Sequence, residues 1–210
     1  MADITKKEQV AVIGCGATGG WVALQLAQLG FAVHVYDQDK VEAHNVVNQN
    51  YGLPDIGNLK TEATANFLKA KGFEIQTTPL FVETGASLSE PYIFCLTDTM
   101  SSRKKIFETL NPFRAKYWIE TRTSKDAFRI YGVEPFRLEH AKQYKATLYD
   151  DKEAERSLCG APIPIMAPTA QAVASMAVWQ LVSYIGEKNP PNVILGGFDP
   201  MCMESFNFAA

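Results

Sequence analysis

A glycine-rich turn near the start of the chain constrains the fold more than any other feature of the sequence. The apolar run at residues 10–13 leads into Gly14-Cys15-Gly16-Ala17-Thr18-Gly19, and apolar residues at largely helical spacing follow up to Gly30. Residues 31–36 are rich in β-forming side chains and end at Asp37. Strand, glycine turn, helix and strand make a βαβ unit, whose parallel strands require a right-handed crossover. We therefore predict half of a Rossmann-like fold at the start of the chain.

The rest of the chain continues the alternation of strands and helices. Periodicity predicts helices over residues 60–71, 101–110 and 168–185, and strands over residues 73–77, 92–96, 117–120 and 127–133. We expect an α/β fold, Rossmann-like and doubly wound, with a mainly parallel sheet and helices on both faces. The pattern breaks at about 134–165, which we interpret as a crossover or lid segment within a single domain of residues 1–210.

Composition excludes several classes of function. A net charge of -3 and no basic run longer than residues 103–105 argue against nucleic acid as a partner. The apolar run at residues 10–13 is too short for a membrane span or a secretion signal, so we expect a cytoplasmic protein that does not bind membranes. The cysteines form no CxxC pair, which predicts neither a zinc site nor a disulfide framework; they are Cys15, Cys95, Cys159 and Cys202.

The glycine turn and the end of the second strand predict a nucleotide site. Glycines let the backbone approach a phosphate, and a helix N-terminus offers free N–H donors with a partial positive charge. The carboxylate of Asp37 is placed to accept hydrogen bonds from ribose hydroxyls. These features fit NAD, FAD or ATP about equally, and a tight turn without a ligand is the structural alternative.

Three further motifs follow in order and narrow the choice of ligand. They are Asp37-x-Asp39 with Asn45-x-x-Asn48-Gln49, then Asp55-x-Gly57-x-x-Lys60, then Asp98-Thr99-x-x-x-Arg103. Together with the glycine turn, over about residues 8–186, they resemble the ThiF/MoeB/HesA family of ubiquitin-activating-enzyme-like adenylyltransferases. The middle of the chain is similar to small stand-alone members from prokaryotes and phages.

The resemblance implies a role for each matching residue. Lys60 and Asn45 would contact the phosphates, Asp98 would ligate Mg²⁺, and Arg103 would join them in catalysis. The whole nucleotide set would be Gly14, Gly16, Ala17, Gly19, Asp37, Asp39, Asn45, Asn48, Gln49, Lys60, Asp98 and Thr99. Attack of a carboxylate on the α-phosphate builds negative charge, which a lysine and a hard Mg²⁺ ion stabilise.

Two positions depart from the family pattern. Asn48 stands where the family usually has an arginine, and only Lys6 and Lys7 precede the first strand, where family dimers supply another arginine. Arginine is a bidentate phosphate ligand, whereas lysine is a point charge. A non-catalytic nucleotide-binding homologue is therefore an open alternative.

Two residues outside these motifs are further candidates. Cys159 lies in the irregular segment with Arg156 nearby, and the resemblance implies a nucleophile that captures the activated carboxyl terminus as a thioester or acyl-disulfide. The alternative is a small packed cysteine. Arg122 follows a buried strand at the carboxyl edge of the sheet, where it would guide the substrate tail or form an exposed salt bridge.

The resemblance implies an ATP- and Mg²⁺-dependent adenylyltransferase. Its substrate would be the C-terminal carboxylate of a ubiquitin-like protein, a sulfur-carrier protein or a peptide, and the enzyme would be a homodimer. The rival from the residues alone is an NAD(P)-dependent oxidoreductase that uses the same glycine turn and Asp37. That rival leaves Lys60, Asp98 and Arg103 without a role.

Overall fold

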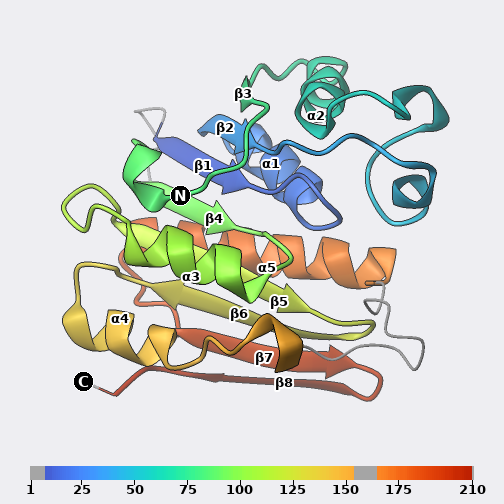
Figure 1. Ribbon diagram of the computed structural model, residues 1–210. Coiled ribbons are helices and arrows are strands. Elements are labelled where there is room, and N and C mark those ends of the chain that lie inside the picture. Colours follow the sequence, from blue (N-terminus) through green and yellow to red (C-terminus); the bar gives the residue numbers. More distant parts are fainter. Residues whose placement is uncertain (1–7, 154–164, 210) are drawn as a thin grey trace.

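A computed structural model describes residues 8–153 and 165–209 of the chain (Figure 1). Its sheet has the strand order β3-β2-β1-β4-β5-β6-β7-β8. The strands are β1 (Gln9–Ile13), β2 (Ala32–Tyr36), β3 (Gln76–Thr78), β4 (Tyr92–Cys95), β5 (Tyr117–Thr123), β6 (Ala127–Val133), β7 (Val193–Phe198) and β8 (Met201–Phe206). The α-helices are α1 (Gly19–Gln28), α2 (Lys60–Lys69), α3 (Met100–Glu108), α4 (Leu138–Lys145) and α5 (Ala167–Ile185).

The sheet has a parallel half and an antiparallel half. Strands β3, β2, β1, β4 and β5 pair in parallel, whereas β5, β6, β7 and β8 pair antiparallel. Helices α1 and α5 cover one face of the sheet, and α3 and α4 cover the other (Figure 1). This arrangement confirms the predicted α/β fold with a mainly parallel, doubly wound sheet.

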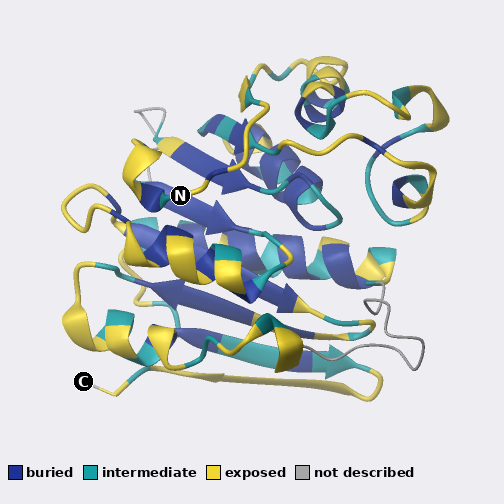
Figure 2. Cartoon of the chain, in the orientation of Figure 1, coloured by how far each residue is buried: buried dark blue, intermediate teal, exposed yellow. Residues whose placement is uncertain are grey.

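Burial explains why the central strands are continuous apolar runs. Residues 10–13 of β1 and all of β4 are buried, because helices cover both faces of these strands. Figure 2 shows the same burial through the middle of the sheet and a fully exposed β8. Val12 contributes to the core beneath α1 and α5, and Trp118 to the core beneath α3 and α4. Packing on both faces thus holds the central strands in place. Because these strands are parallel, their carboxyl ends lie at the same edge of the sheet.

Some elements differ from the sequence-based expectations. Strand β3 begins at Gln76 and not at residue 73, and β5 runs on to Thr123, so Arg122 lies inside a strand. Helix α4 occupies part of the expected crossover segment, and β7 and β8 were not predicted. Helix α4 buries only Tyr144 and β8 is exposed throughout, so neither element carries the apolar periodicity that reveals a helix or a strand.

Within the described ranges, no helix has both the length and the apolar character needed to cross a bilayer.

Candidate nucleotide and acyl-transfer site

A cavity of about 1140 Å³ lies at the carboxyl edge of the parallel strands. Its lining includes most of the residues singled out in the sequence, namely Gly14, Gly16, Ala17, Asp37, Asp39, Asn45, Gln49, Lys60, Asp98, Arg103 and Arg122. Three of the singled-out residues do not line the cavity, namely Gly19, Asn48 and Thr99. Gly19 packs against Gly14, Asn48 bonds to Ile165, and Thr99 caps α3. The fold therefore brings four separate sequence motifs to one site.

The glycine turn is built by close backbone contacts. Gly14 has φ +95°, and a Cβ there would lie 2.8 Å from the Leu96 carbonyl oxygen. A Cβ at Gly19 would lie 1.8 Å from the Gly14 carbonyl oxygen, so Gly19 closes the turn from behind. In contrast, a Cβ at Gly16 would meet no atom within 4 Å. The turn leaves space above Gly16 while its two flanking glycines fix its shape.

Helix α1 begins directly behind this turn. The Thr18 side chain makes no capping hydrogen bond, and the first turn of α1 contains no acidic residue. The Gly20 N–H contacts the Gly16 carbonyl oxygen at 3.4 Å. The other N–H groups of the first turn can still face an anion, and the helix dipole favours one there. This geometry fits a phosphate group.

Asp37 connects the end of β2 to the glycine turn. Its Oδ2 accepts a hydrogen bond from the Cys15 N–H at 2.7 Å, and its Oδ1 accepts one from the Asp39 N–H at 2.8 Å. Burial raises the pKa of Asp37, although these two backbone donors oppose the shift. Each oxygen retains a second lone pair, so the carboxylate can hold the turn and still accept from ribose hydroxyls.

Lys60, Asn45 and Gln49 line the cavity on the α2 side. Lys60 is the first residue of α2, and its Nζ lies 2.9 Å from Asp39 Oδ2. The Asn45 Oδ1 accepts a hydrogen bond from the Glu42 N–H at 2.9 Å, which holds this buried side chain in place. In the described part of the chain, the buried Gln49 Oε1 has no hydrogen-bond partner. A nucleotide ligand would supply a donor for that atom.

Asp98 follows β4 and is exposed toward the cavity. The N-cap of α3 is Thr99, whose Oγ1 accepts a hydrogen bond from the Ser102 N–H at 3.3 Å, so Asp98 is not occupied as the cap. The described residues contain no group of three potential metal ligands. Mg²⁺ usually binds one or two carboxylates together with phosphate and water oxygens, and Asp98 fits that mode.

Asn48, which stands at the position of the family arginine, is engaged elsewhere. Its Nδ2 donates to the Ile165 carbonyl oxygen at 3.2 Å. This contact joins the turn after the 3₁₀-helix at Ala43–Val47 to the chain just before α5. Asn48 therefore links two segments that border the cavity through this hydrogen bond.

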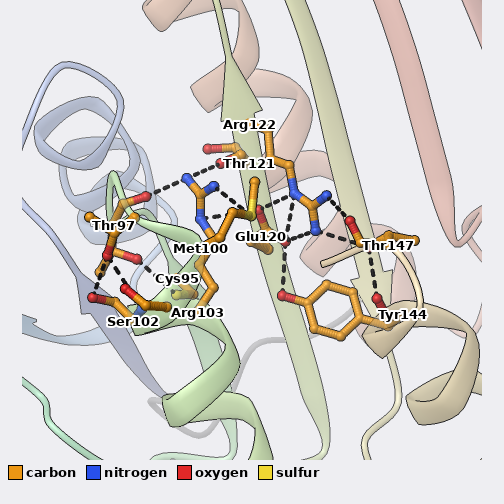
Figure 3. A network of polar contacts seen from close by, with 12 residues as sticks. Cys95, Thr97, Met100, Ser102, Arg103, Glu120, Thr121, Arg122, Tyr144 and Thr147 are labelled. Atoms are coloured by element: carbon orange, nitrogen blue, oxygen red, sulfur yellow. Dashed lines mark hydrogen bonds and ion pairs between the residues drawn. The ribbon is translucent and has the colours of Figure 1, made fainter. Parts of the chain in front are cut away.

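The buried carboxylate of Glu120 lies at the centre of a polar network that includes the cavity residues Arg103 and Arg122 (Figure 3). Glu120 on β5 is fully buried and accepts hydrogen bonds from Arg122 Nε and Nη2, both at 2.9 Å. The Tyr144 hydroxyl donates to it at 2.8 Å, and Arg103 Nε lies 3.3 Å away. Arg103 also donates from Nη2 to the carbonyl oxygens of Thr97 and Thr121. One carboxylate thus holds two guanidinium groups in fixed positions.

Arg122 is buried and not an exposed salt-bridging residue. It donates from Nη1 to the Thr147 carbonyl oxygen at 2.7 Å and from Nη2 to Thr147 Oγ1 at 2.9 Å. Its guanidinium also lies 4.4 Å from the centre of the Tyr131 ring. Burial lowers the pKa of Arg122, but the hydrogen bonds and charge of Glu120 outweigh it and raise the pKa above its usual value.

Sequence reasoning gave no role to four other charged residues of the cavity, which are Glu42, Arg129, Asp151 and Glu153. Asp151 accepts hydrogen bonds from the N–H groups of Met100 and Ser101 at the start of α3. Arg129 lies on β6 and is exposed. The charged stretch around Asp151 was visible in the sequence, but only the fold places it beside Asp98. No sequence motif marked Arg129.

The cysteines fall into two groups. Cys15 and Cys95 are fully buried, and burial raises the pKa of both thiols, to about 11 for Cys95. They are core residues. Cys202 is exposed on β8. Cys159 and its neighbour Arg156 lie outside the described residues.

Comparison with known proteins assigns the family. Residues 2–207 match the model of the ThiF family, and the chain therefore belongs to that family. A segment of 68 residues is 34% identical to the ATP-dependent ubiquitin transferase-like protein Cap2 of Vibrio cholerae. That match covers 30% of this chain and 12% of Cap2.

Solved structures show the same fold. PaaA superposes with a TM-score of 0.75 at 19% identity, over 97% of this chain and 65% of PaaA. E. coli MccB with ATP gives a TM-score of 0.74 at 19% identity, over 97% of this chain and 64% of MccB. MccB in complex with N-formylated MccA gives 0.72 at 19% identity, over 96% of this chain and 65% of that chain. The chain thus spans somewhat less than two thirds of the length of these proteins.

Proposed function

We propose that this protein is an ATP-dependent adenylyltransferase that activates the C-terminal carboxylate of a protein or peptide. The observation that carries the proposal is one cavity that joins the glycine turn, Asp37, Lys60 and Asp98. An oxidoreductase would need the glycine turn and Asp37 but would give Lys60 and Asp98 no task. A triphosphate with its metal ion gives a task to all four.

Membership of the ThiF family and the relatives support this proposal. Solved structures of E. coli MccB contain ATP, or AMPCPP together with MccA, and Cap2 is described as an ATP-dependent ubiquitin transferase-like protein. The finer proposal is that the substrate is a ubiquitin-like or sulfur-carrier protein or a peptide. We also propose a homodimer, and a thioester or acyl-disulfide on Cys159.

Each cavity residue has a task in this reaction. Asp37 would hold the ribose, while the start of α1 and Lys60 would bind phosphate oxygens. Asp98 would hold Mg²⁺, which neutralises charge on the phosphates when bound. Because Lys60 is paired with Asp39 at 2.9 Å, it keeps a fixed position before the nucleotide arrives.

Direct titration tests nucleotide binding. We expect MgATP to bind more tightly than NAD, and Lys60→Ala to weaken MgATP binding by about tenfold or more, since it removes a hydrogen bond to a charged group. Lys69→Ala, at the exposed end of the same helix, is the matched control and should bind MgATP normally. Tighter binding of NAD than of MgATP by the unaltered protein would overturn the proposal.

Pyrophosphate exchange separates an enzyme from a non-catalytic homologue. Exchange should depend on Mg²⁺ and on the protein or peptide that co-purifies with the chain. Cys159→Ser should leave exchange nearly intact and remove any thiol-labile conjugate, because adenylation precedes thiol attack. MgATP binding without exchange, in the presence of that partner, would favour the non-catalytic homologue.

A further inference from the structure

The cavity extends well beyond the residues assigned to the nucleotide. The glycine turn follows β1, Asp37 follows β2 and Lys60 begins α2, and both strands lie on one side of β4, which leads to Asp98. On the other side the lining comes from the hairpin of β5 and β6, and includes Thr123 and Arg129. Neighbouring strands lie about 4.8 Å apart, so β6 is roughly 10 Å from β4. The hairpin therefore lines a part of the same cavity that the proposed nucleotide residues do not.

The register of the strands places Arg129 level with the carboxyl edge of the sheet, where Asp98 lies. Cys95 on β4 pairs with Glu120 on β5, and Arg122, two residues further along β5, pairs with Arg129 on β6. Arg129 is therefore level with the residue two positions after Cys95, which is Thr97, the neighbour of Asp98. Because paired residues on antiparallel strands point to the same face, Arg129 shares its face of the sheet with Arg122.

Arg129 differs from the other cations of the cavity in its charge balance. Lys60 is paired with Asp39, and Arg103 and Arg122 both lie against Glu120. In residues 8–153 and 165–209, Arg129 forms no ion pair. Two like charges directly opposite each other on paired strands are destabilising. Because the charge of Arg122 is already balanced by Glu120, the exposed guanidinium of Arg129 is the group of this cross-strand pair that favours a further anion.

The geometry of in-line displacement at the α-phosphorus indicates which anion Arg129 would bind. The carboxylate must approach the α-phosphorus opposite the departing pyrophosphate. In the proposed function Lys60 and Asn45 lie on the phosphate side, toward β2 and α2. The opposite approach runs over the ends of β5 and β6, where Arg129 is exposed.

We propose that Arg129 docks the C-terminal carboxylate of the acyl substrate and aligns it for attack. This inference rests on the proposed adenylation and adds the direction of approach and the docking residue. Arg103 and Arg122 line the same cavity and are held in place by Glu120. Arg129 thus supplies an exposed guanidinium in a chain that has Asn48 at the family's arginine position.

A pair of small probes tests the proposal without knowledge of the natural substrate. N-acetyl-glycylglycine carries the carboxylate, and N-acetyl-glycylglycinamide lacks it. With saturating AMP, ligand-observed NMR should show that the unaltered protein binds the acid about tenfold more tightly than the amide, the size expected for a charge-assisted hydrogen bond. Arg129→Ala should remove this preference and leave binding of the amide unchanged. Arg129→Lys should keep part of it.

Controls separate this inference from the proposed function. Lys125→Ala removes an exposed cation from the turn between β5 and β6 that does not line the cavity, and it should keep the preference. MgATP affinity and the midpoint of thermal unfolding should be unchanged in Arg129→Ala. A preference that survives in Arg129→Ala, or a missing preference in a protein that binds MgATP, would overturn this inference alone. Loss of MgATP affinity in Arg129→Ala would also overturn it and assign Arg129 to the nucleotide. Failure of the unaltered protein to bind MgATP would overturn the proposed function itself.

Discussion

Two carboxylates at the same edge of the sheet, Asp37 and Glu120, are held in contrasting ways. Asp37 is partly exposed and accepts hydrogen bonds from the backbone N–H groups of Cys15 and Asp39. Glu120 is fully buried, and its partners are side chains from β5, α3 and α4. The proposed nucleotide side is therefore held by backbone hydrogen bonds within the first βαβ unit, whereas the proposed acyl side, around Glu120 and Arg129, depends on side-chain charges from several elements. The two sides should respond differently to mutation.

The largest expected effect on stability is at Glu120. Glu120→Ala leaves two buried guanidinium groups without their carboxylate, and breaking such a pair costs about 3–5 kcal/mol. Urea denaturation should show this loss in the free energy of unfolding. A loss below about 1 kcal/mol would mean that water or other groups replace the carboxylate easily.

Asp98 should show the reverse pattern, with a large loss of activity and no loss of stability. Asp98→Ala removes the proposed Mg²⁺ ligand, so we expect Mg²⁺-dependent pyrophosphate exchange to fall about 100-fold or more. Because Asp98 is exposed, the free energy of unfolding should change by no more than about 0.5 kcal/mol. Exchange retained within about twofold would contradict the assigned role.

The glycines of the turn allow a matched comparison within the nucleotide side. Gly14→Ala places a Cβ 2.8 Å from a backbone oxygen at φ +95°, and should destabilise the protein by about 1–3 kcal/mol. Gly16→Ala meets no protein atom, so it should leave stability nearly unchanged and weaken MgATP binding by filling the space above the turn. Thermal unfolding and MgATP titration of both variants check this prediction. Equal effects on stability would show that the turn relaxes at both positions.

The smallest expected effect is a pH dependence at Asp151. Hydrogen bonds from Ser101 and Met100 lower the pKa of this partly exposed carboxyl below its usual value. A carboxyl with a lowered pKa stabilises the folded state above its unfolded pKa, and this contribution is lost as pH falls through the folded value. We therefore expect the stability difference between the unaltered protein and Asp151→Asn to shrink below about pH 4. Asp150→Asn is the matched control, and an equal pH dependence in both variants would contradict the contact.

The two sides also differ in how far the sequence predicted them. The glycine turn, Asp37 and Lys60 lie in ordered motifs that the sequence displays directly, and the fold places them together at the cavity. In contrast, the burial of Arg122 was not predicted, because it depends on Glu120 and on Thr147, which lies 25 residues away along the chain.

By itself, the sequence determined the doubly wound α/β fold and the position of the glycine turn, because hydrophobic periodicity and glycine geometry are local properties. It also carried the ordered motifs of the ThiF family. Only the tertiary structure decided the antiparallel strands β7 and β8, helix α4 and the charge network around Glu120. It also decided that Arg129 faces the cavity beside Arg122, since register between strands and pairing of distant charges leave no periodic signal in the sequence.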